Sequence, residues 1–165
     1  LTVHGGKITT YRRLAEEAID SLTPLLKISS GPWTADAPLP GGDIPGGDLD
    51  GFAEAMAARY EWLPEVTVHR YARSYGTRMS EILEGCTRLK DLGQDLGDGG
   101  GLHEREVDYL VKREWATTAD DILWRRTKIG LHTGADTRAR LDAWLTIRKN
   151  KVRWDTQKET TNGIG

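Results

Sequence analysis

The chain has 165 residues, of which 38% are hydrophobic and 29% charged, and its formal net charge is −2. This length suits one hydrophobic core, and the near-neutral charge argues against a nucleic-acid partner. The sequence has no apolar run of about 18 residues that would span a membrane, and its single cysteine, Cys86, forms no internal disulfide, which fits a reducing compartment.

The first stretch, from Thr2 to Thr10, reads as a short strand, a Gly5-Gly6 turn and the start of a helix. Glycines let the backbone approach a ligand closely, and the first N–H groups of a helix attract anions. Lys7 adds a full charge suited to a phosphate or a developing oxyanion. The same letters also fit an ordinary turn with a threonine cap and a solvated lysine.

Residues 11 to 26 carry apolar side chains at helical spacing and predict an amphipathic helix. From residue 27 to residue 50 the periodicity is lost among prolines and glycines, which predicts a long connector. A connector of this length favours a boundary between two parts of the chain.

Three helices are predicted next. The first has Phe52 and Tyr60 on one face and ends near Pro64; the second runs from about Val66 to a stop at Gly76. The third is expected to be capped by Thr77 and to end at Gly85. A glycine-rich loop then covers residues 88 to 102, whose aspartates do not have the spacing of a calcium site.

The strongest helical pattern begins at His103 or Glu104 and reaches Trp115. Glu114 interrupts its apolar stripe, so we expect this carboxylate to need a cationic partner, Arg125 or Arg126.

Thr118 and Asp121 resemble a capping box at the start of the next helix. Arg125, Arg126 and Lys128 then form a basic cluster, interpreted either as structural charge pairing or as a surface for an anionic partner. The last helix is expected over residues 136 to 149, followed by a flexible tail over residues 150 to 165.

The predicted fold is therefore all-α. A bundle-like domain of about six or seven helices occupies residues 51–149, after a strand and helix remnant at 1–26 and the connector at 27–50. No GxGxxG fingerprint follows a strand. The four histidines show no pairing that indicates a metal site, so none is predicted, and each is read as a surface or capping residue.

Several short motifs of the sequence together resemble those of the FAD-dependent glycerol-3-phosphate dehydrogenases, the quinone-linked aerobic enzymes and their oxidase relatives. These motifs lie between residues 1 and 147, in the family's order: GGKITTYR at 5–12, Trp33, LPGG at 39–42, YARSYG at 71–76, EVDYLV at 106–111, EWA at 114–116 and DDILWRRTK at 120–128.

The resemblance implies a parent enzyme that oxidises glycerol 3-phosphate to dihydroxyacetone phosphate and passes electrons through FAD to a membrane quinone. It implies that Gly6, Lys7, Ile8, Thr9 and Thr10 face the flavin and that Lys7 also contacts the substrate. The catalytic base would lie upstream and is unknown. Residues 1–165 alone are expected to be inactive and to retain no FAD.

The resemblance also implies a cytoplasmic enzyme in peripheral contact with the cytoplasmic membrane, and a homodimer is one expectation. Two alternatives remain open. The parent could be an oxidase that passes electrons to oxygen, because these residues do not determine access to the flavin. The helical part could instead be a non-catalytic interaction module with a docking surface of Trp115, Trp124 and Trp144, although their helical spacing favours burial.

Overall fold

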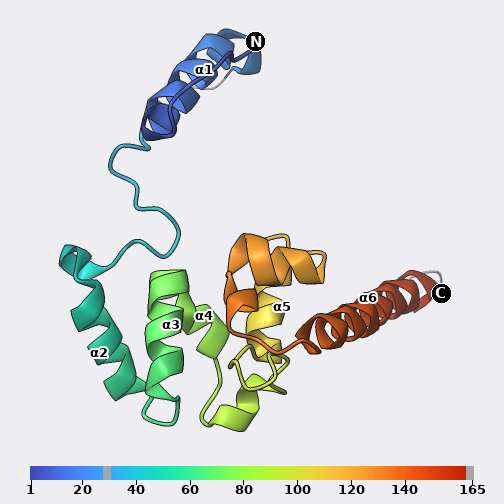
Figure 1. Cartoon of the computed structure of the whole chain (residues 1–165). Coiled ribbons are helices and arrows are strands. Elements are labelled where there is room, and N and C mark those ends of the chain that lie inside the picture. The colour runs from blue at the N-terminus through green and yellow to red at the C-terminus, as the bar shows by residue number, and fades with distance from the viewer. Residues whose placement is uncertain (28–30, 163–165) are drawn as a thin grey trace. The chain divides into compact units, whose positions relative to one another are not determined.

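The computed structural model describes residues 1–27 and 31–162, and the chain divides into two units at Asp43 and Ile44. Every regular element in these residues is helical, apart from one isolated antiparallel bridge between Asp95 and His103 (Figure 1). The all-α prediction is confirmed. None of the described helices has the length and apolar character needed to cross a membrane.

The first unit holds helix α1, Tyr11–Leu26, which matches the predicted helix and continues from a 3-10 turn, Ile8–Thr10. None of its side chains is buried, although its apolar stripe is present. Residues 1–7 form no strand. The strand expected at Thr2 and Val3 is absent because no other segment of the described chain pairs with it, and a strand requires a ladder partner.

The connector prediction covers residues 28–30, which lie outside the described residues. From residue 31 onward the chain stays irregular until the 3-10 turn Pro45–Gly47. Helix α2 then begins at Leu49, where the Asp48 carboxylate accepts a hydrogen bond from the Gly51 N–H at 2.9 Å. This is an ordinary side-chain cap of a free N–H group.

The second unit contains α2 (Leu49–Arg59), α3 (Glu65–Tyr75), α4 (Met79–Leu83), α5 (Glu104–Arg113) and α6 (Thr137–Asn162). Helices α2 and α3 lie side by side, and α4 and α5 pack beyond them (Figure 1). The unit has one continuous core, whose fully buried large side chains include Tyr71, Met79, Ile82, Leu83, Leu92, Leu102, Leu110, Ile122 and Leu141.

Gly76 ends α3 with a φ of 53°, a left-handed conformation that glycine adopts without strain, as predicted. The predicted cap at Thr77 was wrong. Thr77 lies inside a 3-10 turn, Gly76–Arg78, which leads directly into α4, so the N-cap position belongs to Arg78. A tight turn placed before the helix shifts the cap by one residue.

The glycine-rich loop is held by one carboxylate. Asp95 accepts hydrogen bonds from the backbone N–H groups of Gly97, Gly99 and Gly101 at 2.7–3.1 Å. A short 3-10 turn, Leu89–Leu92, precedes it. The described residues contain no cluster of acidic, histidine or cysteine side chains that could hold a metal ion.

The carboxylate that is fully buried in the core is Glu106 of α5. Arg70 of α3 donates to both of its oxygens, at 2.6 and 2.7 Å, and the Tyr75 hydroxyl donates to one of them at 2.5 Å. Arg70 also donates to the Gly101 carbonyl at 2.8 Å, which joins the loop to both helices. Burial and the charge of Glu106 raise the pKa of Tyr75, so its phenol stays neutral and donates.

Glu114 is half-buried, as the sequence predicted, and Arg126 is a cationic residue beside it. It lies at the end of α5, where its backbone, not its carboxylate, receives a 2.7 Å hydrogen bond from Arg126. Partial burial raises the pKa of its carboxyl group, with Arg126 opposing the shift. Trp115 next to it has a φ of 55° and is 82% exposed, because the helix has already ended.

The capping box is confirmed. The Asp121 N–H donates to the Thr118 hydroxyl, and the Thr118 N–H donates to the Asp121 carboxylate, at 3.1 and 3.0 Å. A π-helical segment, Asp121–Arg126, follows. Arg125 forms an ion pair with Asp121 at 3.0 Å, so pairing accounts for part of the basic cluster.

Helix α6 continues to Asn162, whereas the sequence predicted a helix to residue 149 and a flexible tail over 150–165; residues 163–165 lie outside the described residues. Polar residues with good helix propensity extend a formed helix at little cost, so polarity alone did not indicate its end. Its first half is tied to the rest of the second unit by ion pairs of Arg140 with Asp98 and of Arg148 with Asp108, at 2.8 and 2.7 Å.

We expect Glu106→Ala to destabilise the second unit strongly, because it leaves the Arg70 guanidinium half-buried without its partner. Breaking a buried pair in this way costs about 3–5 kcal/mol. Glu65→Ala is the matched control on α3, where an exposed carboxylate lies 3.6 Å from His69, and it should cost less than about 1 kcal/mol. Urea unfolding followed by circular dichroism measures both. Equal losses would contradict the assignment of Glu106 as the central contact.

Candidate functional site

The stretch singled out from the sequence forms one exposed turn at the start of α1. Gly5 and Gly6 have φ values of 76° and 125°, in the region that favours glycine. The backbone N–H and the hydroxyl of Thr10 both donate to the Lys7 carbonyl at 3.0 Å. Thr10 therefore closes the turn, and its side chain does not cap α1.

The two glycines have different surroundings. A Cβ on Gly5 would meet nothing within 4 Å, whereas one on Gly6 would lie 3.2 Å from the Leu14 side chain. Gly6 thus folds back over α1, and Gly5 remains open to a ligand. This arrangement leaves the turn accessible from one side while α1 supports the other.

Lys7 is exposed and extended, and within the described part of the chain it makes no ion pair. Ile8 after it is 87% exposed. The N–H groups that open a helix have no partner within it and add partial positive charge. The predicted residues Gly6, Lys7, Ile8, Thr9 and Thr10 therefore form one contiguous surface suited to an anion, and their roles toward a ligand stay a prediction.

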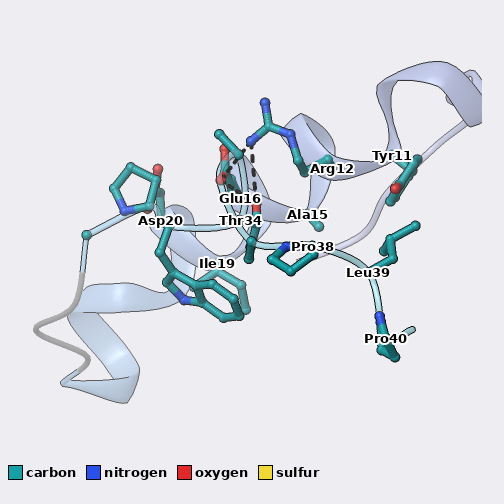
Figure 2. A pocket seen from close by; sticks show the side chains of 15 residues that line it. Tyr11, Arg12, Ala15, Glu16, Ile19, Asp20, Thr34, Pro38, Leu39 and Pro40 are labelled. Atoms are coloured by element: carbon teal, nitrogen blue, oxygen red, sulfur yellow. Dashed lines mark hydrogen bonds and ion pairs between the residues drawn. The ribbon is translucent and has the colours of Figure 1, made fainter. Parts of the chain in front are cut away.

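Sequence reasoning missed a groove next to this turn. It has a volume of about 620 Å³ and lies between α1 and residues 31–40 of the connector. Figure 2 shows Tyr11, Ala15 and Ile19 along α1 facing Pro38 and Leu39. The prolines and large apolar side chains of residues 31–40 could have indicated this groove, but the segment was interpreted only as a connector.

A polar cluster of Arg12, Glu16 and Thr34 links the two walls of the groove (Figure 2). The Thr34 hydroxyl donates to the Glu16 carboxylate at 2.5 Å, and Arg12 donates to the same oxygen at 3.0 Å. The hydrogen bond from Thr34, followed by the charge of Arg12, lowers the pKa of Glu16. Arg12 thus contacts both the helix and the connector.

Among the residues that the structure describes, the histidines and the cysteine do not assemble into a site. His103 is buried at the N-cap of α5 with Nδ1 3.0 Å from the Gly101 carbonyl, and His69 lies 3.6 Å from Glu65. Cys86 is half-buried, and burial raises the pKa of its thiol, so a nucleophilic thiolate is disfavoured.

A family model described as the C-terminal domain of alpha-glycerophosphate oxidase matches residues 32–159. Among curated proteins, the chain is 48% identical to a glycerol-3-phosphate dehydrogenase of Pseudomonas aeruginosa and 44% identical to the aerobic glycerol-3-phosphate dehydrogenase of Escherichia coli, each over 145 residues. It is also 47% identical over 145 residues to a D-erythritol 1-phosphate dehydrogenase of Brucella abortus.

These three alignments cover 88% of this chain but only 28% of each relative. The chain therefore spans little more than a quarter of the length of these curated relatives.

We expect Thr34→Val to raise the pKa of Glu16 toward its ordinary value, because it removes the hydrogen bond that lowers this pKa most. Thr23→Val is the control, since that hydroxyl bonds only the Ile19 carbonyl on the same helix. Carboxyl-carbon NMR during an acid titration measures the shift. A Glu16 titration curve that Thr34→Val leaves in place would show that the connector is not held on α1.

Proposed function

Because the chain belongs to the family of the C-terminal domain of alpha-glycerophosphate oxidase, we propose that it is part of a flavoenzyme that oxidises glycerol 3-phosphate to dihydroxyacetone phosphate. Two relatives with this substrate in their names are 44% and 48% identical to it. The observation that carries the proposal is the exposed Gly5–Lys7 turn at the start of α1, which suits an anionic ligand.

The turn fits a flavin. An open Gly5 allows close approach of a planar ring, and the start of α1 places partial positive charge where a reduced ring gathers negative charge. Gly6, Lys7, Ile8, Thr9 and Thr10 are the residues proposed to hold it. When bound, FAD supplies the acceptor for the hydride that leaves the substrate carbon.

Lys7 is proposed to hold the substrate. Its ammonium group is exposed and lacks an ion-pair partner in the described residues, so it is available to a phosphate or to a developing oxyanion. Oxidation of the secondary alcohol removes a hydride from carbon and a proton from oxygen. The group that takes the proton is proposed to lie upstream of residue 1.

The proposal assigns a role to each part of the chain. Residues 1–26 complete an FAD-binding domain, residues 27–50 connect it to the helical domain, and residues 51–149 form that domain. Residues 1–165 alone are then inactive and retain no FAD, because most of the binding surface lies elsewhere.

The Gly5–Lys7 turn does not determine the exact substrate or the electron acceptor, which depend on the rest of the parent enzyme. The D-erythritol 1-phosphate dehydrogenase relative makes a longer polyol phosphate a second candidate substrate. The family's description makes an oxidase a second candidate activity, with oxygen in place of membrane quinone as the acceptor. Assays of the whole polypeptide with each substrate and each acceptor separate these possibilities.

The interaction-module alternative has less support. Trp144 packs against the core and donates its indole N–H to Glu104 at 3.0 Å, so it does not form a docking surface with Trp115. Trp124 is 38% exposed and Trp115 82% exposed. Burial was expected for all three, and this expectation was wrong for Trp115 and Trp124, which are both exposed. The Trp115 backbone has left the helix, with a φ of 55°.

We expect Lys7→Ala in the whole polypeptide to abolish most glycerol 3-phosphate turnover while FAD content is retained. The reason is that the cation contacts the substrate and the backbone of the turn remains. Arg13→Ala, an exposed basic residue on the first turn of α1, is the control and should leave turnover unchanged. Turnover and bound flavin absorbance measure the two effects. Unchanged turnover in Lys7→Ala would contradict the proposed substrate contact of Lys7 and leave Gly5–Lys7 as an ordinary turn.

We also propose a cytoplasmic enzyme in peripheral contact with the membrane, and a homodimer. For the membrane contact alone, the supporting observation is the basic cluster, in which Lys128 joins Arg125 and Arg126. We expect neutralising all three to weaken sedimentation with anionic vesicles, since each cation near such a surface contributes about 1 kcal/mol. Neutralising the exposed residues Arg73, Arg88 and Lys90 is the control. Unchanged sedimentation of the first variant would remove the cluster from the proposal.

A further inference from the structure

Lys7 occupies the N-cap position of the Ile8–Thr10 turn, and its side chain forms no cap hydrogen bond. Serine, threonine, aspartate and asparagine are usual at this position, because a side-chain oxygen there accepts from a free N–H group. A lysine offers no acceptor, and its charge adds to the partial positive charge of a helix start. The first turns of this helix also hold no acidic residue. The helix start is therefore cationic and uncapped, a departure from local rules that is typical of functional sites.

The backbone before Lys7 gives this residue little support. Gly5 and Gly6 both have positive φ values, and glycine loses more conformational freedom on folding than any other residue. Residues 1–7 form no regular structure. The conformation of Lys7 is thus fixed mainly from its C-terminal side, where the helix begins.

Thr10 supplies this support twice. Its backbone N–H and its hydroxyl both donate to the Lys7 carbonyl at 3.0 Å. The two bonds hold Lys7 in an extended conformation, with φ −94° and ψ 141°, and so fix the direction in which its side chain leaves the helix start. Leu14, whose side chain lies 3.2 Å from the position of a Cβ on Gly6, is four residues after Thr10. This spacing places both on one face of the helix, so a polar and an apolar contact hold the turn from the same side.

Thr10 has no hydrogen-bond donor left for a ligand. A threonine has one hydroxyl donor and one backbone N–H, and both are used on the Lys7 carbonyl. The N–H groups of Ile8 and Thr9, by contrast, have no hydrogen-bond partner among the described residues. Ile8 and Thr9 can therefore donate to an anion directly, whereas Thr10 acts on the site by holding its neighbour.

We propose that Thr10 is a positioning residue for Lys7. Its hydroxyl holds the lysine backbone so that the ammonium group is directed toward the substrate phosphate. The inference rests on the proposed function, in which Lys7 contacts glycerol 3-phosphate, and it narrows the role of Thr10 in that site to one that acts through the lysine.

The test uses the whole FAD-loaded polypeptide. Thr10→Val keeps the shape of the side chain and the backbone hydrogen bond but removes the hydroxyl donor. A hydrogen bond of this kind corresponds to about three- to tenfold in an equilibrium constant, so we expect kcat/KM for glycerol 3-phosphate to fall by that factor while FAD content is retained. Thr10→Ser keeps the hydroxyl and should restore kcat/KM. Thr23→Val is the matched control, because its hydroxyl donates at 3.0 Å to the Ile19 carbonyl further along α1, and it should change nothing.

A double-mutant cycle separates positioning from a general effect on the fold. In a Lys7→Ala background the side chain that Thr10 positions is gone, so adding Thr10→Val should lower the residual kcat/KM no further. Dihydroxyacetone phosphate binding, followed by the flavin absorbance, gives a second cycle that does not depend on turnover. Fully additive losses would overturn the proposal, since Thr10 would then act independently of Lys7.

The remaining outcomes distinguish this inference from the proposed function. Unchanged kcat/KM in Thr10→Val together with a large loss in Lys7→Ala would overturn the positioning role alone. Loss of flavin from Thr10→Val would also overturn it, because Thr10 would then hold the cofactor directly. If Lys7→Ala leaves turnover unchanged, the proposed substrate contact fails, and the positioning role fails with it whatever Thr10→Val does.

Discussion

The second unit is organised around the need to compensate one buried charge. Glu106 is fully buried, and an isolated carboxylate in such a place would be too costly to keep. Arg70 and Tyr75 from α3 satisfy its oxygens, and Arg70 also binds the Gly101 carbonyl. Two helices and a glycine-rich loop are therefore held in one arrangement, since displacing any of them leaves a buried polar group without a partner.

The packing around this pair follows from the same requirement. The rings of Tyr71, Tyr75 and Tyr109 meet edge to face, with centroids 5.7 and 5.4 Å apart, and Arg70 lies over the Tyr71 ring at 4.8 Å. These contacts place aromatic surface next to the ion pair.

The first unit contrasts with this arrangement. α1 has an apolar stripe and no buried side chain, so its stability within this chain comes from local contacts such as Arg12 with Glu16 and Thr34. The unit displays two chemically different surfaces, a cationic turn at Lys7 and a charge-balanced apolar groove beside it.

The sequence by itself determined most of the helices and their approximate limits, except the end of α6, together with the Thr118–Asp121 capping box and the turn at Gly5–Lys7, because spacing, caps and glycines act locally. Its short sequence motifs also indicated the family to which the chain belongs. Only the tertiary structure decided that Glu106 and not Glu114 is the buried carboxylate, that Trp115 is exposed, and that the connector forms a groove with α1. Burial depends on which distant segments of the chain come into contact. Helical periodicity does not predict where along a helix the packing stops or which segment covers each face.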